Sequence, residues 1–147
     1  GGEMKGKSNN NARRTTYNGV TYDSGSEARY AAVLDQQLAG GVIDGWKRGV
    51  PIRMVGTITY KPDFCVWTRP CPDHTDTWWV DVKGREYRDF RLKMRLWLET
   101  GPGKLITVKE RGTSGTFKID QEWIPGQKAP VRKRKTKKRV VVTVRKG

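Results

Sequence analysis

One apolar segment, Trp78 to Lys83, restricts the folds open to this chain, because it is typical of a strand yet carries two charges. Side chains alternate between the two faces of a strand. Trp78, Val80 and Val82 therefore share one face, whereas Asp81 and Lys83 share the other. Together with the helices predicted before and after it along the chain, this strand predicts a sheet flanked by helices.

A first amphipathic helix is predicted upstream of this strand. Ser24 can cap its start, Glu27 follows three residues later as in a capping box, and Gly40-Gly41 stops it. Its apolar stripe consists of Ala31, Leu34 and Leu38 at helical spacing. Glu27 projects onto the same face, so the sequence places a carboxylate on the buried side of this helix.

A second helix is predicted from Tyr87 to Glu99, and Gly101-Pro102-Gly103 ends it. Its inward positions are Phe90, Met94 and Trp97. Its basic residues, mostly outward, are Arg88, Arg91, Lys93 and Arg95. The helix therefore combines an apolar inner face with a basic outer one.

Strands are predicted on both sides of the second helix. They cover Pro51–Val55, Thr57–Trp67 and Thr77–Lys83 before it, and Leu105–Lys109 and Thr116–Ile119 after it. A strand or hairpin around Asn18-Gly19 precedes the first helix, and a loop over Thr68–Asp76 joins two of the strands. This order predicts an α/β fold with a central mixed sheet flanked by helices.

Positive charge dominates the chain. Its 147 residues suit a single core, and 30 Lys and Arg residues against 15 acids give a net charge of +15. From Lys128 to Gly147 there are ten basic residues and no acid. We divide the chain into a flexible basic arm (1–15), a core (16–125) and a basic tail (126–147). The expected partner of such a surplus is a polyanion, most commonly nucleic acid.

The basic tail is open to two interpretations. It binds phosphates without reading sequence, or it is a solubilising or localising extension. Within it, Val140–Val144 is β-branched and could pair as a short strand. The basic side chains expected to contact DNA are Arg13, Arg14, Lys93, Arg132, Lys133, Arg134, Lys135, Lys137, Lys138 and Arg139.

The composition disfavours several classes of protein. No apolar run approaches the about 20 residues of a membrane-spanning helix, and no segment resembles a secretory signal. Cys65 and Cys71 are too few for a disulfide scaffold, so a reducing cytoplasm is expected. Together with Asp73 and His74 they superficially suggest zinc, but the paired Cys-x-x-Cys spacing is missing. Cys65 is better explained as a small core residue.

Two acids on neighbouring strands form the candidate site. Asp63 follows Pro62 at the start of one strand, and strand alternation brings it near Asp81 of the next. Such carboxylates repel each other, and one pKa rises unless a cation lies between them. Magnesium suits this position because it prefers oxygen ligands and keeps several waters. Glu27 could be a third ligand, and Lys83 could orient water or offset charge on the transition state.

Each candidate also has a structural explanation. Asp81 and Lys83 could form a surface ion pair across strands. Asp63 could be a turn residue after a proline. Glu27 is explained without function as the glutamate of a capping box.

The same residues resemble the motifs of the PD-(D/E)xK nuclease superfamily. They are Asp23-Ser24-Gly25-Ser26-Glu27-Ala28-Arg29 opening a helix, Lys61-Pro62-Asp63-Phe64, and Val80-Asp81-Val82-Lys83-Gly84 followed by a basic helix. The resemblance covers the chain from about Tyr17 to Lys109. Small size and basic flanks are most similar to phage and archaeal Holliday-junction resolvases. Two features depart from the pattern: the second acid is aspartate, where glutamate is frequent, and the basic extension after Gly126 lies outside the common core.

The resemblance implies a restriction-endonuclease-like fold and divalent-metal-dependent DNA cleavage. It also implies a homodimer that places two active sites on a four-way junction. Asp63 and Asp81 would be metal ligands. Glu27 would be an additional ligand and Lys83 the catalytic lysine, with Mg²⁺ as the cofactor and Mn²⁺ able to substitute.

The expected function is thus a Mg²⁺-dependent, structure-selective endonuclease acting on branched DNA in the cytoplasm, the host's if the gene belongs to a phage. One alternative is a nicking or restriction-type enzyme that cuts duplex DNA. Another is a nucleic-acid-binding protein without catalysis. Neither a membrane nor a small-molecule cofactor is expected.

Overall fold

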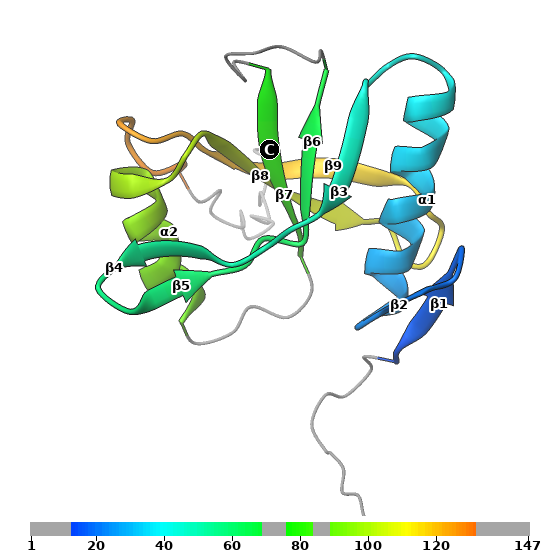
Figure 1. Cartoon of the computed structure of the whole chain (residues 1–147), viewed down its shortest axis with the longest axis horizontal. Coiled ribbons are helices and arrows are strands. Elements are labelled where there is room, and N and C mark those ends of the chain that lie inside the picture. Colours follow the sequence, from blue (N-terminus) through cyan, green and yellow to red (C-terminus); the bar gives the residue numbers. More distant parts are fainter. Residues whose placement is uncertain (1–12, 69–75, 84–88, 132–147) are drawn as a thin grey trace, which may run out of the picture.

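A computed structural model describes residues 13–68, 76–83 and 89–131 (Figure 1). The described elements are, in chain order, β1 (Thr15–Tyr17), β2 (Val20–Tyr22), α1 (Gly25–Ala39), β3 (Gly45–Arg48), β4 (Ile52–Val55), β5 (Ile58–Tyr60), β6 (Phe64–Trp67), β7 (Thr77–Val82), α2 (Phe90–Thr100), β8 (Lys104–Glu110) and β9 (Phe117–Trp123).

Five strands form one mixed sheet in the order β3-β6-β7-β8-β9. The pairs β3–β6 and β6–β7 are antiparallel, β7 and β8 run parallel, and β9 returns antiparallel to β8. Parallel neighbours need a crossover connection, and α2 lies in the one between β7 and β8. The predicted α/β class, a mixed sheet with helices, is confirmed.

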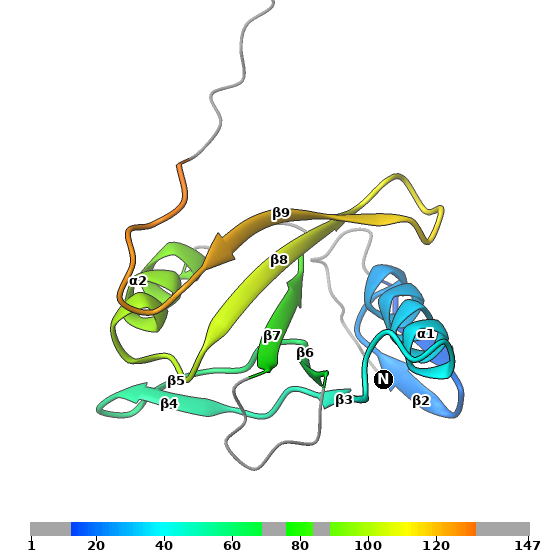
Figure 2. The ribbon, with the colours of Figure 1, turned by 90° about the horizontal axis from the view of Figure 1, so that it is seen from above.

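The sheet separates two apolar cores, and each core is covered by one helix (Figure 2). On one side, Leu34 of α1 packs with Val66 and Val80 of the sheet. On the other side, Trp97 of α2 belongs to a core with Leu105 and with residues of the β4–β5 hairpin. A sheet covered on both faces can shield polar groups from solvent on either side.

Alternation along β7 has the predicted result. Trp78, Val80 and Val82 belong to the core beneath α1, whereas Trp79 packs against the core beneath α2. Asp81 therefore points to the α2 side of the sheet.

The β1–β2 hairpin turns at Asn18 and Gly19, as predicted. Both residues have positive φ (53° and 81°), which a tight two-residue turn of this kind requires. Asp35 of α1 then ties two strands to the helix. It accepts hydrogen bonds from the Tyr17 hydroxyl (2.7 Å) and from the Trp46 indole N–H (2.9 Å).

Helix α1 begins and ends where the sequence predicts. The Ser24 hydroxyl accepts a hydrogen bond from the Glu27 N–H (3.1 Å), and the Gly40 N–H donates to the Gln36 carbonyl (3.0 Å). The predicted stripe is wrong at Leu38, which is 41% exposed. The buried positions of this helix end at Leu34, so its last turn extends beyond the core.

Three strand predictions need correction. The single strand predicted over Thr57–Trp67 is two strands, β5 and β6, which belong to different sheets. Pro62 lies at the break. It has no backbone N–H, so it cannot donate a hydrogen bond to a neighbouring strand. Strand β3 was not predicted, because its burial pattern has no apolar alternation. Strand β9 continues past Ile119 to Trp123 as a largely exposed edge.

Several predictions concern residues outside the described ranges. These are Arg88, the zinc alternative at Cys71, Asp73 and His74, and the strand at Val140–Val144. Within the described ranges, neither helix has the length and apolarity needed to cross a bilayer.

Candidate functional site

The two predicted acids meet where β6 and β7 pair. Asp63 directly precedes β6, and Asp81 lies in β7. The pairing of Phe64 with Val80 continues the register to Asp63 and Asp81, so the two side chains are cross-strand neighbours. Their carboxyl groups share a hydrogen bond. The sequence prediction that these acids lie close together is therefore correct.

Backbone hydrogen bonds fix Asp63 from three directions. Its N–H donates to the Val80 carbonyl (3.0 Å), and its Oδ2 accepts from the Val82 N–H (2.7 Å). Its carbonyl accepts from the Gly49 N–H (2.9 Å). A side chain at Gly49 would not fit, because its Cβ would lie 1.9 Å from the Pro62 carbonyl oxygen. Strand packing, rather than a surface turn, thus sets the position of the Asp63 carboxyl.

Tyr60 adds a third polar group to the acid pair. Its hydroxyl donates a hydrogen bond to Asp81 Oδ2. Its ring is buried and packs edge-on against Trp97 of α2, with centroids 5.8 Å apart. The core beneath α2 therefore holds the Tyr60 hydroxyl against Asp81.

Negative charge on both acids is opposed by their surroundings. Burial raises the pKa of Asp63 well above its usual range, and repulsion from Asp81 raises it further. Burial also raises the pKa of Asp81, although hydrogen bonds from Asp63 and Tyr60 lower it. Two full charges about 4 Å apart repel by about 4 kcal/mol at an effective dielectric constant of about 20. The pair therefore shares a proton unless a cation takes its place.

Glu27 lies in the first turn of α1 and is partly buried. Burial raises its pKa to about 6, and the charges of neighbouring acids, Asp81 among them, contribute. Two cations that offset part of this effect are Arg48 and Lys61. The helix cap uses the backbone N–H of Glu27, so it does not account for the position of the carboxylate.

Lys83 follows β7 and interacts with two carboxylates, those of Asp120 and Asp81. Its Nζ is 3.4 Å from Asp120 Oδ2 of β9. Its charge also lowers the pKa of Asp81. Within the described residues, the ion pair of Lys83 is with Asp120, so the alternative of a surface pair between Lys83 and Asp81 does not describe this arrangement.

The donor set fits a divalent cation bound with few protein ligands. Among the residues that the structure describes, no three His, Cys, Asp or Glu side chains gather closely enough to hold a metal ion. Asp63 and Asp81 are brought together, and Glu27 does not join them in such a set. Magnesium is commonly held by one or two carboxylates and retains several waters. Asp63 and Asp81 supply that number of carboxylates at a site where positive charge would be stabilised.

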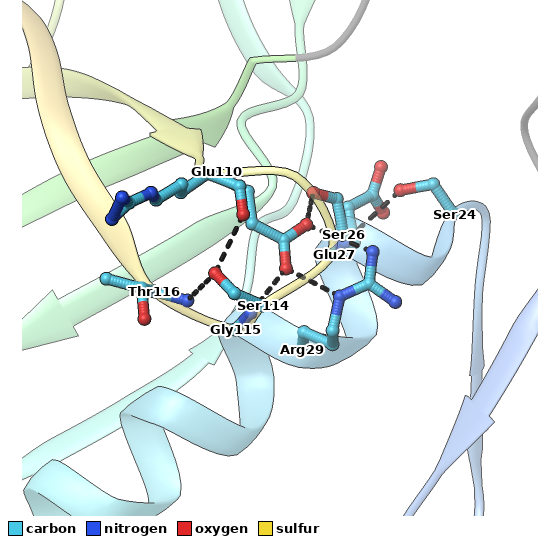
Figure 3. Close-up of polar contacts among 9 residues, drawn as sticks. Ser24, Ser26, Glu27, Arg29, Glu110, Ser114, Gly115 and Thr116 are labelled. Carbon is cyan, nitrogen blue, oxygen red and sulfur yellow. Dashed lines mark hydrogen bonds and ion pairs between the residues drawn. The ribbon is translucent and has the colours of Figure 1, made fainter.

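Glu110 anchors the start of α1, which carries Glu27, to the turn between β8 and β9 (Figure 3). Its carboxylate accepts hydrogen bonds from Arg29 Nε (2.6 Å) and Nη2 (3.0 Å), the Ser26 hydroxyl (2.7 Å) and the Gly115 N–H (2.7 Å). Burial alone would raise the pKa of Glu110, but these hydrogen bonds lower it. The anchor fixes α1, and thus Glu27, relative to the sheet.

The basic residues predicted to contact DNA are described only in part. Arg13 and Arg14 are exposed ahead of β1. Lys93 of α2 is partly buried, and its Nζ donates to the Thr59 carbonyl (2.8 Å), which ties α2 to β5. The remaining candidates, Arg132, Lys133, Arg134, Lys135, Lys137, Lys138 and Arg139, lie outside the described residues.

Sequence reasoning missed Tyr60 and Asp120. In one continuous strand, Tyr60 and Asp63 would face opposite sides because they are an odd number of residues apart. The break at Pro62 removes that restriction. Asp120 was missed because the predicted strand stopped at Ile119, one residue earlier.

Comparison with protein-family models, with curated proteins and with solved structures finds no match to this chain.

Proposed function

We propose that this protein is a metal-dependent, structure-selective DNA endonuclease that cuts branched DNA, with four-way junctions as its main substrate. The observation that carries the proposal is the contact between Asp63 and Asp81, two partly buried acids on neighbouring strands. Two carboxylates held against each other with little solvent repel, and a bound cation relieves this repulsion.

Support also comes from the order of elements and motifs. Helix α1, strands β6 and β7, helix α2 and strand β8 follow one another in the order predicted from the sequence, although the strand predicted over β6 also took in β5. The motif residues that resemble PD-(D/E)xK nucleases occur at the start of α1 and on the paired strands β6 and β7. A restriction-endonuclease-like core is the finer fold assignment that we propose on this basis.

Each residue has a chemical part in the proposed reaction. Asp63 and Asp81 would hold a divalent cation, Mg²⁺ or in its place Mn²⁺, which would supply a Lewis acid for the phosphoryl group and lower the pKa of a bound water. Lys83 offsets negative charge that develops on the phosphate. Tyr60 keeps Asp81 oriented through its hydrogen bond. Glu27 adds negative charge near the cation from the anchored end of α1.

The net charge of +15 supports a nucleic-acid substrate, because clustered cations bind the phosphate backbone without reading sequence. Four-way junctions have two-fold symmetry, so we propose a homodimer with one site for each of two opposed strands. We place the reaction in the cytoplasm, the host's if the gene is carried by a phage.

Cleavage of a synthetic four-way junction tests this proposal. With Mg²⁺, the full-length protein should cut the junction symmetrically. Asp81→Asn should abolish cleavage yet leave junction binding intact, because it removes one carboxylate and none of the basic surface. Asp44→Asn is the matched control, since Asp44 is exposed and precedes β3. Undiminished cleavage by the Asp81→Asn protein would refute the assignment.

The same assay separates the alternatives. Equal rates on junction, flap and linear duplex would favour a nicking or restriction-type enzyme. Tight binding without cleavage of any substrate, in Mg²⁺ or Mn²⁺, would favour a binding protein without catalysis.

A further inference from the structure

A groove of about 570 Å³ opens beside the acid pair. It lies between α2, β9 and the segment after β9, which runs alongside α2 (Figure 2). That segment is fixed to the helix, since the Gly126 N–H donates to the Leu98 carbonyl (2.9 Å). Lys83 lines the groove and also lowers the pKa of Asp81, so the groove adjoins the candidate site.

The groove is lined by more positive than negative charge. Its cationic side chains are Lys83, Arg91, Arg95 and Lys118, and Asp120 is the carboxylate among its described lining. Asp120 is already paired with Lys83 (3.4 Å). Arg95 and Lys118 are exposed, and they come from opposite walls, α2 and β9. An anionic strand that passes between the walls would be held from both sides.

The groove also offers apolar surface. Ile119 is 54% exposed on β9, and Val131 is 89% exposed on the segment after it. Trp123 lines the same groove, and its buried indole N–H has no hydrogen-bond acceptor among the residues that the structure describes. The groove therefore combines exposed aliphatic side chains with the partly buried ring of Trp123.

We infer that this groove seats an unpaired nucleotide of a single DNA strand. The cations on α2 and β9 bind its phosphates, and the apolar positions contact the face of its base. The inference rests on the proposed function and deepens it, because the preferred substrate is then DNA with unstacked nucleotides next to the cleaved bond.

Duplex DNA complements this groove poorly. A duplex presents phosphates on its outside, but its bases are stacked on each other and their faces are hidden. A single strand exposes both, and proteins that bind it commonly combine a basic groove with apolar contacts to the bases. Paired cations and exposed apolar residues in one groove therefore favour the single strand.

Binding of labelled oligodeoxythymidine to the full-length protein tests the inference. The assay is run in EDTA, so that binding is measured without cleavage. The double variant Arg95→Gln with Lys118→Gln should bind the single strand about tenfold more weakly. The salt dependence of log K should fall by about 1.4, which corresponds to two phosphate contacts with a single strand. Arg53→Gln with Lys104→Gln is the matched control, since both residues are exposed away from the groove.

The contribution of the base is measured separately. An abasic strand with the same number of phosphates should bind the unaltered protein several-fold more weakly than oligodeoxythymidine. Ile119→Ser should remove most of this difference. Ile58→Ser, at an exposed position on β5, should leave it unchanged.

Either of two results would overturn the inference. One is an equal loss of single-strand affinity in the groove and control double variants, which would mean that only diffuse charge attracts DNA. The other is an equal loss for a duplex of the same length, which would mean that no unpaired nucleotide is recognised. Cleavage is not measured in this assay, so neither result would refute the endonuclease proposal. Conversely, failure of junction cleavage would not refute binding of a single strand in the groove.

Discussion

Asp63 is the described residue whose ionisation is most strongly opposed by its surroundings. It is partly buried and lies against Asp81, and the interaction that favours its charged form is a hydrogen bond from the Val82 N–H. A carboxyl with a raised pKa in the folded state favours folding while it is protonated and opposes folding once it ionises. Ionisation of the acid pair therefore lowers the free energy of unfolding at neutral pH, and a bound cation would offset this loss.

Metal-free protein should consequently become less stable as the pH rises. The contribution of Glu27 is complete below its ordinary pKa of 4.5 and is lost by the time the pH passes about 6. Asp63, with its pKa raised well above 3.8, adds to this loss of stability as it ionises. Urea unfolding in EDTA at a series of pH values measures the effect.

Two comparisons make that measurement specific. Mg²⁺ should restore stability at pH 8, and Asp63→Asn in EDTA at pH 8 should be more stable than the unaltered protein by about 1–2 kcal/mol. Stability that increases between pH 5 and pH 8 in EDTA would contradict the assignment of raised pKa values to these acids.

The contact between Asp63 and Asp81 could be predicted from the sequence, but the residues that surround this pair could not. Alternation along two apolar strands is local information, and it correctly placed Asp63 near Asp81. The contacts of Tyr60 and Glu110 depend on where distant segments pack. Arg29 and Glu110, for example, are 81 positions apart, and no local pattern relates them.

Among the elements, the start of β6 is the one on which the site depends most. The chain leaves the β4–β5 hairpin, passes Pro62 and enters the main sheet at Phe64. Gly49 makes this path possible because, without a side chain, it can lie close to the Pro62–Asp63 backbone. Its N–H donates a hydrogen bond to the Asp63 carbonyl.

Gly49→Ala should therefore damage the site as well as the fold. Its Cβ would lie 1.9 Å from the Pro62 carbonyl oxygen, so the segment carrying Asp63 has to move. We expect a loss of about 1–3 kcal/mol in the free energy of unfolding, together with slower junction cleavage. Gly40→Ala is the control, since its Cβ would meet its nearest atom at an ordinary 3.4 Å. Equal behaviour of the two variants would show that the close approach at Gly49 is unimportant.

Helices were easier to predict than strands for a physical reason. Both helices have capping or stop residues and an apolar stripe, and their backbone hydrogen bonds are made within the segment itself. Strand β3 has two exposed charged residues and becomes a strand by pairing with β6. The predicted strand over Thr57–Trp67 failed because apolar residues continue on both sides of the break, so periodicity alone does not reveal that the halves join different sheets.

At the scale of the whole molecule, charge is divided between a core and a tail. Residues 132–147 contain nine Lys and Arg residues and no acid. The core carries the acid pair, whereas this segment carries the largest cluster of positive charge along the chain. Binding and cleavage should therefore be separable.

A chain that ends at Val131 should retain the fold and lose DNA affinity. Removing nine cations should reduce the salt dependence of log K for a duplex by up to about eight, if each cation contacts a phosphate. Titrations at several salt concentrations measure this slope. A full-length variant with Gln at the nine positions is the matched control and should behave like the truncated chain. An unchanged slope in both would mean that the segment does not contact DNA.

Binding of Mn²⁺ by titration calorimetry tests the central claim most directly, because it measures the cation site without any DNA. The unaltered protein should bind Mn²⁺ at a site that Mg²⁺ competes for. Asp81→Asn should lower the affinity at least about tenfold, as loss of one of two carboxylate ligands requires, and Asp44→Asn should match the unaltered protein. Equal Mn²⁺ affinity in the Asp81→Asn and unaltered proteins would show that the acid pair is not a metal site.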